Sequence, residues 1–379
     1  MAKKLRVGII FGGRSGEHEV SIRSAASVIR SIDRKKYDVV PVAISREGKW
    51  LSLADAFHLL PANAQSLLPV KLGAGSRAAV AILGDPSHTG LLSLGRKGGT
   101  SNSQKLDVVF PVLHGPFGED GTLQGLLEMA NVPYVGCGVL ASSCGMDKVA
   151  MKLLFLQAGL PICKYVWFLR TQWQTDRATI IKTITRKLGL PCFVKPANLG
   201  SSVGVSRADD KASLARAVEL AAQYDRKIVV EEAVDAREIE CAVIGNNEPR
   251  ASLPGEYVIY EKSAAFLDYA EKYTNTGHVE FVVPAPVSKS LATRIQKIAI
   301  RAFQSIDGSG LARVDFFLSR DSKKLLINEL NTMPGLTEVS GYPKMWAGSG
   351  LSYSRMLDEL IELALERHRE KSLNKTTRA

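Results

Sequence analysis

Short apolar runs and helical periodicities alternate along the first third of the chain. Residues 5–11, 39–44 and 108–113 are largely apolar runs, which are typical of strands buried on both faces of a parallel sheet. Residues 21–32 and 122–130 instead carry apolar side chains at helical spacing. Because strands and helices alternate in this order, the pattern predicts a wound parallel sheet.

The pattern changes after this region. Residues 53–105 contain scattered glycines and no clear apolar period, so we interpret them as an insertion without an assigned structure. Farther on, 312–318 and 324–330 are apolar strands joined by a polar turn at 319–323, which predicts a hairpin. The remaining predicted strands are 133–135, 165–169, 192–195, 228–232 and 239–244, and the remaining predicted helices are 147–158, 178–188, 213–222, 290–306 and 353–369.

Length and composition favour a multidomain globular protein. At about 150 residues per domain, 379 residues predict two or three domains, and 45% hydrophobic content excludes bulk disorder. No apolar run approaches the roughly 18 residues of a membrane-spanning helix, and the run at 7–11 is shorter than the core of a signal peptide. We therefore expect a cytoplasmic protein without a membrane partner.

Charge and cysteine usage change this picture little. The 49 Lys and Arg residues exceed the 38 Asp and Glu residues, which gives a net charge of +11. The basic residues are dispersed and are not interleaved with aromatic residues, so we expect anionic small molecules and no nucleic acid as partners. The five cysteines contain no C-x-x-C pair, which argues against zinc and disulfides: Cys137, Cys144, Cys163, Cys192 and Cys241.

Two glycine-containing turns follow predicted strands. The first, 12–19, carries Glu17 and Glu19 at a helix entrance, where they would hold a cation such as an ammonium group or would only complement the helix dipole. In the second, Lys195 ends a strand and small residues follow at 200–204. Amide groups and hydroxyls of such a loop can close over phosphate oxygens beside a lysine, although a mobile surface hairpin is the alternative.

The predicted hairpin carries the most specific set of polar residues. Arg313 and Asp315 lie two residues apart, as do Glu329 and Asn331, so each pair points to one face of its strand. Paired strands would bring three oxygen ligands together, a set that suits Mg²⁺. An exposed polar sheet face is the alternative. Residues 228–238 join an apolar strand to an acidic turn that would suit adenine and ribose, and residues 257–279 would suit a lid over an active site. A solvated loop is the alternative for both segments.

Together and in this order, these motifs resemble the D-alanine–D-alanine ligases of the ATP-grasp superfamily. The resemblance runs from residue 5 to the last predicted helix. Its motifs are 11–21 (FGGRSGEHEVS), 114–125 (HGPFGEDGTLQG), 146–148 (MDK), 194–196 (VKP), 200–204 (GSSVG), 266–273 (FLDYAEKY), 312–315 (ARVD) and 328–335 (NELNTMPG).

The resemblance implies an α/β fold in which an N-terminal wound parallel-sheet domain precedes a two-lobed ATP-grasp fold. We place the N-terminal domain at 1–146, the central lobe at 147–233 and the C-terminal lobe at 234–379, with the lid at about 257–279. The reaction implied is ATP-dependent ligation of two D-alanine molecules through an acyl phosphate, giving ADP and phosphate, for peptidoglycan precursor synthesis. A homodimer is also expected.

The resemblance also implies a role for each matching residue. Lys148, Lys195, Lys272 and Ser202 would contact ATP phosphates; Glu231, Glu232, Val234 and Glu238 would border adenine and ribose; Asp315, Glu329 and Asn331 would hold two Mg²⁺ or Mn²⁺ ions. Glu17 would bind the ammonium group of the first D-alanine, and Ser201 and Tyr273 would link Glu17 to the lid. Arg313 and the Gly335 amide would stabilise the oxyanion. Ser340 would hold the carboxylate of the second D-alanine, and His114 would line the substrate end of the site.

Two alternatives remain open at this point. Another ATP-grasp ligase would join D-alanine to D-lactate or D-serine, but Tyr273 favours the dipeptide, because ester-forming relatives lack this tyrosine. A regulatory or nucleic-acid-binding protein is the alternative from another class. The complete set of Asp315, Glu329 and Asn331 argues against it.

Overall fold

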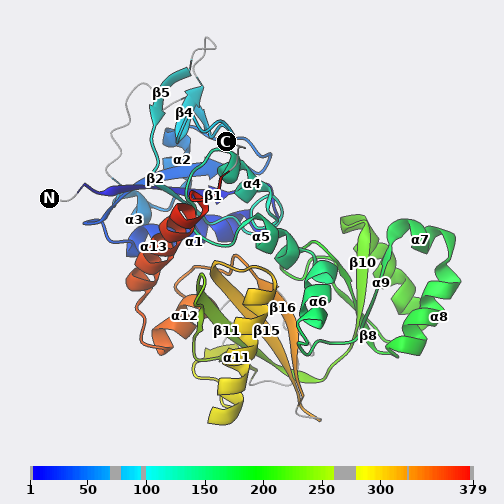
Figure 1. Ribbon diagram of the computed structural model, residues 1–379. Coiled ribbons are helices and arrows are strands. Elements are labelled where there is room, and N and C mark those ends of the chain that lie inside the picture. The colour runs from blue at the N-terminus through cyan, green and yellow to red at the C-terminus, as the bar shows by residue number, and fades with distance from the viewer. Residues whose placement is uncertain (1–2, 69–77, 95–99, 260–278, 322–323, 376–379) are drawn as a thin grey trace.

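The N-terminal sheet is parallel, as the apolar runs predict. In the computed structural model of the chain, residues 3–68, 78–94, 100–259, 279–321 and 324–375 are described. β1 (Leu5–Gly12) lies between β2 (Tyr37–Ile44) and β6 (Val108–Pro111), and α1 (His18–Ser31) connects β1 to β2 (Figure 1). The predicted strand at 133–135 is reduced to a single bridge between Val109 and Tyr134.

The insertion at 53–105 has local structure that its irregular pattern did not predict. It contains α2 (Leu53–Leu59), α3 (Ala62–Gln65) and a small antiparallel sheet of β3 (Ala79–Ala81), β4 (Leu91–Leu94) and β5 (Thr100–Gln104). The helices α4 (Thr122–Met129) and α5 (Val139–Met146) then lead out of the N-terminal region. α5 was not predicted, because its apolar residues have almost no helical periodicity.

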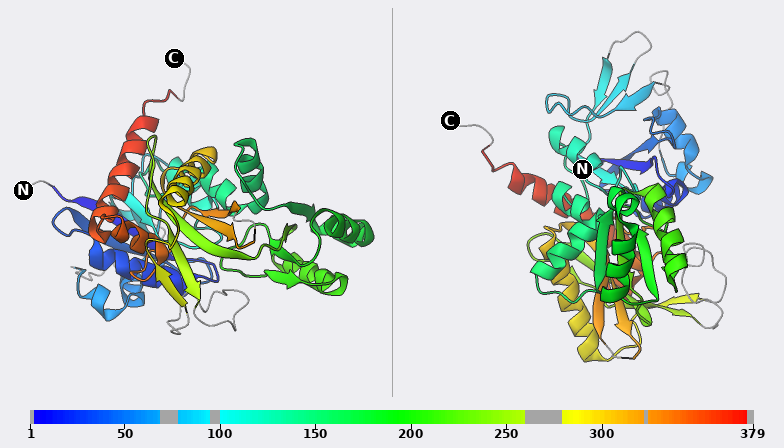
Figure 2. Two further views of the ribbon diagram at one scale, coloured as in Figure 1. Left: turned by 90° about the horizontal axis from the view of Figure 1, so that it is seen from below. Right: turned by 90° about the vertical axis from the view of Figure 1, so that its right-hand side faces the viewer.

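The central part of the chain forms an antiparallel sheet that projects from the rest of the molecule (Figures 1 and 2). Its strand order is β7-β10-β8-β9, and apolar side chains of β8 and β10 pack against α9. The elements of this part are α6 (Lys148–Gln157), β7 (Tyr165–Leu169), α7 (Arg170–Thr175), α8 (Arg177–Lys187), β8 (Cys192–Pro196), β9 (Ser206–Ala208), α9 (Lys211–Tyr224) and β10 (Lys227–Glu232).

The third large sheet has the strand order β14-β13-β11-β15-β16 and is covered on one face by α11 (Lys289–Ser305). Val314 and Phe316 of β15 face this helix, so the alternate residues Arg313 and Asp315 face the other side. The strands are β11 (Ala236–Gly245), β12 (Arg250–Ala251), β13 (Gly255–Ile259), β14 (Val279–Val282), β15 (Gly310–Ser319) and β16 (Leu325–Asn331).

Two C-terminal helices connect this sheet to the N-terminal region. α12 (Gly341–Gly348) packs on β11, and α13 (Tyr353–Lys371) contributes Met356, Leu357 and Leu360 to a core that also contains residues of α1 and β1. Figure 1 shows α13, in red, between the N-terminal sheet and the C-terminal sheet. The predicted boundaries at 146/147 and 233/234 fall between elements, and the division into three domains stays a prediction.

Among the described helices, none combines the length and the apolar content that crossing a lipid bilayer requires. Six brief elements were also not predicted, because short segments leave little periodicity to detect: α7, β9, β12, β13, β14 and α12.

Arg367 of α13 ties the last helix to the first region. Its guanidinium donates to the carbonyl oxygens of Gly136 and Tyr134 and to Ser309 Oγ, the last at 2.7 Å, and lies 4.3 Å from the centre of the Tyr134 ring. The contacts with Gly136 and Tyr134 join segments that are more than 200 residues apart in sequence.

We therefore expect Arg367→Met to destabilise the protein by about 1–3 kcal/mol, because two buried carbonyl groups lose a charged donor. Chemical denaturation followed by circular dichroism measures the shift. Arg369→Met, at an exposed position of the same helix, is the matched control. Equal stability of the two variants would contradict the assigned role of Arg367.

Candidate active site

The hairpin of β15 and β16 brings the predicted metal ligands onto one face. Asp315 is the cross-strand partner of Glu329, and Arg313 is the partner of Asn331. Directly opposed residues of an antiparallel pair point to the same side of the sheet. The prediction that these strands pair in this way is confirmed.

Arg313 is enclosed by carboxylates. Its Nε and Nη2 donate to the two oxygens of Asp315, each at 2.7 Å, and Nε lies 3.4 Å from Glu240 Oε1. Burial lowers the pKa of Arg313, but the charges of Asp315 and Glu240 raise it well above its usual range. The guanidinium is therefore a fixed positive charge beside the candidate metal ligands.

The oxygen donors of this face fit a hard divalent cation. Asp315 and Glu329 supply carboxylates and Asn331 an amide oxygen, which accepts from the Met333 amide at 2.8 Å. Each carboxylate oxygen has two lone pairs, so Asp315 can bind Arg313 and a cation together. In the described part of the chain, no group of three or more His, Cys, Asp or Glu side chains is placed to hold a metal ion. The candidate metal site therefore needs the amide oxygen of Asn331 as its third ligand.

Two lysines, one on α6 and one on β8, lie close to these carboxylates. Lys148 Nζ lies 3.7 Å from Glu329 Oε2 and donates to the Leu199 carbonyl at 2.7 Å. Lys195 Nζ lies 2.9 Å from Glu231 Oε2. Burial lowers the pKa of Lys195, whereas Glu231 and Glu329 raise it, and the net shift is upward. The Lys195 ammonium is therefore charged beside Glu231.

Among the residues predicted to border adenine, Glu231 and Glu232 point to opposite faces of β10. Glu231 is buried, whereas Glu232 accepts from the Lys164 amide at 2.8 Å and pairs with the Lys164 side chain at 3.6 Å. Successive residues of a strand point to opposite faces, which explains why Glu232 turns away from Glu231. Val234 lies in the turn after β10, and Glu238 lies on β11.

The loop at 200–204 folds over the glycine-rich turn of the N-terminal region. Ser201 Oγ donates to Glu17 Oε1, although the two residues are 184 positions apart. Ser201 and Ser202 have φ values of 52° and 57°, in the left-handed region that few non-glycine residues adopt. The loop is therefore held against Glu17, which disfavours the alternative of a mobile surface hairpin.

His114 is buried between α1 and the loop after β16. Its Nδ1 lies 3.0 Å from the Met333 carbonyl oxygen, so Nδ1 carries hydrogen, and Nε2 lies 3.2 Å from Ser24 Oγ. Burial lowers the pKa of His114. A neutral ring that accepts from Ser24 satisfies both contacts, and His114 thus fixes the position of the 333–335 segment.

Ser340 and Gly335 lie at the other end of that segment, and both are buried. Ser340 Oγ lies 2.6 Å from Thr337 Oγ1 and accepts from the Thr337 amide at 3.2 Å. The Tyr353 hydroxyl of α13 donates to the Leu336 carbonyl and braces the loop. Lys272 and Tyr273 of the predicted lid lie outside the described residues, so their predicted roles stay predictions.

Sequence reasoning assigned no role to three buried charged residues of this region: Glu119, Lys152 and Glu240. Glu119 Oε1 accepts from the Gly115 amide at 2.7 Å, close to Glu17. Glu240 is the cross-strand partner of Asp315 on β11. The signals were weak, since Glu119 lies within the quoted 114–125 motif and Lys152 follows Lys148 at helical spacing.

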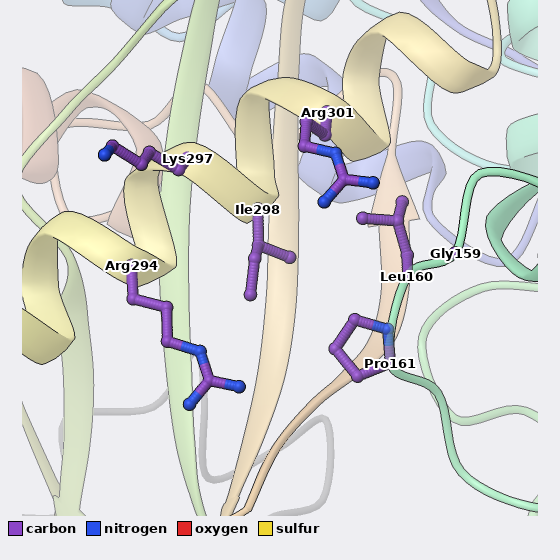
Figure 3. A pocket seen from close by; sticks show the side chains of 7 residues that line it. All are labelled: Gly159, Leu160, Pro161, Arg294, Lys297, Ile298 and Arg301. Carbon is purple, nitrogen blue, oxygen red and sulfur yellow. The ribbon is translucent and has the colours of Figure 1, made fainter.

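Two cavities lie near these elements. One, of about 340 Å³, adjoins His114 and the glycine-rich turn, where the Arg14 guanidinium lies 4.1 Å from the centre of the Phe117 ring. The other, of about 560 Å³, is open and lies between α11 and residues 159–161 (Figure 3). Because α11 covers the opposite face of the β11–β15–β16 sheet, this second cavity contains none of the candidate site residues.

Comparisons with known proteins point to a single family over nearly the whole chain. The family model described as D-ala D-ala ligase N-terminus matches residues 6–137, and that described as D-ala D-ala ligase C-terminus matches 154–362. The chain is 46% identical to the D-alanine–D-alanine ligases of Natranaerobius thermophilus and Heliobacterium modesticaldum, covering 99% of this chain and 98% of each relative.

Solved structures show the same fold. The D-alanine–D-alanine ligase from Coxiella burnetii superposes with a TM-score of 0.81 at 36% identity, covering 98% of this chain and 97% of that one. The VanG D-Ala:D-Ser ligase from Enterococcus faecalis gives the same TM-score and identity, covering 96% and 100%. The fold alone therefore does not distinguish these two second substrates.

The surroundings of Glu119 generate a prediction about pH. Burial and the charge of Glu17 raise the pKa of Glu119 well above the usual carboxyl range. Between the ordinary value of about 4.3 and this raised value, the folded state holds a proton that the unfolded state has lost. Glu119 therefore lowers the stability of the protein progressively as pH rises through that window.

Glu119→Gln removes this titration but keeps the acceptor for the Gly115 amide. We expect the stability of the variant relative to the parent protein to increase with pH above about 4.5, with a limiting slope of about 1.4 kcal/mol per pH unit. Denaturation at a series of pH values measures it. A stability difference that stays constant with pH would contradict a protonated Glu119.

Proposed function

The chain belongs to the D-alanine–D-alanine ligase family, and from this premise we propose how its residues join two D-alanine molecules with ATP. Ligases of this family form the D-alanyl-D-alanine unit of cell-wall precursors. The single observation that supports the assignment best is the opposition of Asp315 and Glu329 on one sheet face, directly across from Lys148 and Lys195.

We propose that the nucleotide lies between the central and C-terminal lobes. Lys148 and Lys195, joined by Lys272 of the lid, bind the phosphates, and Ser202 closes over them. Adenine and ribose are bordered by Glu231, Glu232, Val234 and Glu238. Glu232 would contribute through its backbone, because its side chain is paired with Lys164.

Asp315, Glu329 and Asn331 would hold two Mg²⁺ or Mn²⁺ ions. Bound there, the ions would neutralise charge on the transferring phosphoryl group and fix its orientation. The neighbouring Arg313 is held by Asp315 and Glu240, so its guanidinium is fixed in position beside the reacting carboxylate.

The amino-acid end would bind the first D-alanine through Glu17, whose carboxylate pairs with the ammonium group. Ser201 donates to Glu17 and holds it in place, and Tyr273 extends this link to the lid. The second D-alanine would be held by its carboxylate at Ser340, while His114 keeps the 333–335 segment against the N-terminal region.

The proposed reaction has two steps. A carboxylate oxygen of the first D-alanine attacks the γ-phosphorus of ATP, and ADP leaves. The amine of the second D-alanine then attacks the acyl carbon, a tetrahedral intermediate forms, and phosphate leaves with the proton that the amine loses. Arg313 and the Gly335 amide stabilise the oxyanion, and the protein contributes positioning and charge and forms no covalent bond.

The proposed function also includes a cellular location, an oligomeric state and a division into domains. We propose a cytoplasmic homodimer that uses two D-alanine molecules and ATP and that has no nucleic-acid or membrane partner. The domain limits proposed above, 1–146, 147–233 and 234–379, would let the nucleotide bind between the last two units. The lid at about 257–279 would close over the acyl phosphate, which water would otherwise hydrolyse.

The test of this function is phosphate release from ATP with and without D-alanine. We expect release to depend on D-alanine, and D-alanyl-D-alanine to be the main product when D-serine and D-lactate compete as second substrates. Chromatography of the products identifies them. Predominant D-alanyl-D-serine would favour the activity named for the Enterococcus faecalis relative, and D-alanine-independent release would exclude the ligase.

The metal assignment has its own test. Glu329→Gln keeps the shape of the side chain but removes the charge that faces Lys148, and we expect at least a tenfold increase in the Mg²⁺ concentration needed for half-maximal phosphate release. Titrating Mg²⁺ at fixed ATP measures this. Glu366→Gln, at an exposed position of α13, is the control, and an unchanged Mg²⁺ titration for Glu329→Gln would contradict the assignment.

A further inference from the structure

Lys152 is a lysine with no exposed surface. It lies on α6, one helical turn after Lys148, and its side chain is 0% exposed. Burying an ammonium group is unfavourable unless acceptors replace the water around it. A residue of this kind in the interior requires specific partners.

The partners of Lys152 lie on two different sheets. Its Nζ is 3.0 Å from Glu231 Oε1 on β10 and donates to the Asn328 carbonyl on β16 at 3.3 Å. Lys195 takes the other oxygen of Glu231, at 2.9 Å, and also donates to Asn328 Oδ1 at 3.4 Å. Glu231 and Asn328 are thus each held by the same two lysines.

A bulge in β16 makes this arrangement possible. Asp315 pairs with Glu329, but the next residue of β15, Phe316, pairs with Ile327, which leaves Asn328 without a cross-strand partner. An extra residue in one strand frees its backbone groups from the ladder. The Asn328 carbonyl can therefore accept from Lys152 while Glu329 beside it stays directed at the candidate metal site.

The two lysines also determine the charge of Glu231. Burial alone would raise the pKa of this carboxyl, but Lys152 and Lys195 lower it to about 2. Glu231 is therefore an ionised carboxylate at any pH near neutrality. Each of its oxygens receives one ammonium group, so each keeps a lone pair for a further donor.

We propose that Lys152 is a positioning residue for base recognition, which holds Glu231 so that the free lone pairs of its carboxylate accept a hydrogen bond from the 6-amino group of adenine. This inference rests on the proposed function, in which Glu231 borders adenine. Lys195 alone cannot replace Lys152, because Lys195 also serves the phosphate end and approaches the other oxygen.

A carboxylate held in this position should make the protein prefer ATP to ITP. Adenine presents an amino donor at position 6 and an acceptor at N1, whereas hypoxanthine presents a carbonyl acceptor at position 6 and a hydrogen donor at N1. An acceptor that faces a fixed carboxylate is repelled, so the protein discriminates ATP from ITP through Glu231. A Glu231 side chain released by loss of Lys152 can rotate or take up a proton, and either change weakens this discrimination.

The experiment compares the dissociation constants of ATP and ITP for the full chain by calorimetry, together with kcat and KM for D-alanine-dependent phosphate release. For Lys152→Met we expect the preference for ATP over ITP to fall at least tenfold. The fall should arise from weaker ATP binding and a raised KM for ATP, with a smaller change in kcat. Lys182→Met, at an exposed position of α8, is the control and should keep the parent preference.

A second variant makes the test independent of how well Lys152→Met folds. Glu231→Gln should lose the preference for ATP to the same extent, and the double variant should lose no more, because Lys152 acts through Glu231. A parent-like ATP preference in folded Lys152→Met or in Glu231→Gln would overturn the inference. Absence of D-alanine-dependent phosphate release in the parent protein would instead refute the proposed function, since the binding comparison does not depend on turnover.

Discussion

The antiparallel pairing of β15 and β16 is the constraint on which the site depends. Alternation along β15 directs Val314 and Phe316 toward α11 and directs Arg313 and Asp315 toward the opposite side. A shift of one residue in the pairing would exchange these two faces, burying the charges under α11. The apolar packing beneath the sheet therefore fixes the register of the polar residues above it.

The charged residues of the site are held in compensated groups. Arg313 lies between Asp315 and Glu240, Lys148 faces Glu329, and Glu231 lies between two lysines. Removing one member of a buried ion pair typically destabilises a protein by about 3–5 kcal/mol, because the remaining charge is left without a partner. The same pairing orients each group before a substrate binds, which reduces the reorganisation that the reaction requires.

The sequence predicted the parts of this arrangement that depend on local periodicity. Two-residue spacing placed Arg313 with Asp315 and Glu329 with Asn331, and the structure confirms their opposition. It could not predict the bulge at Asn328, because a bulge results from how two strands pair and leaves no periodicity of its own. The buried state of Lys152 was missed for a related reason, since its partners Glu231 and Asn328 are 79 and 176 positions away.

The amino-acid end shows why long-range contacts matter more for function than for the fold. Glu17 alone would be a carboxylate at a helix entrance, for which complementing the helix dipole is a sufficient explanation. Ser201 changes that interpretation, because its hydroxyl donates to Glu17 from a loop that begins only a few residues after Lys195.

The backbone of that loop also supplies the Leu199 carbonyl that holds Lys148. One short segment thus contacts both the group proposed to bind an ammonium ion and a lysine proposed to bind phosphate. A shift of this segment would therefore alter both ends of the proposed site together.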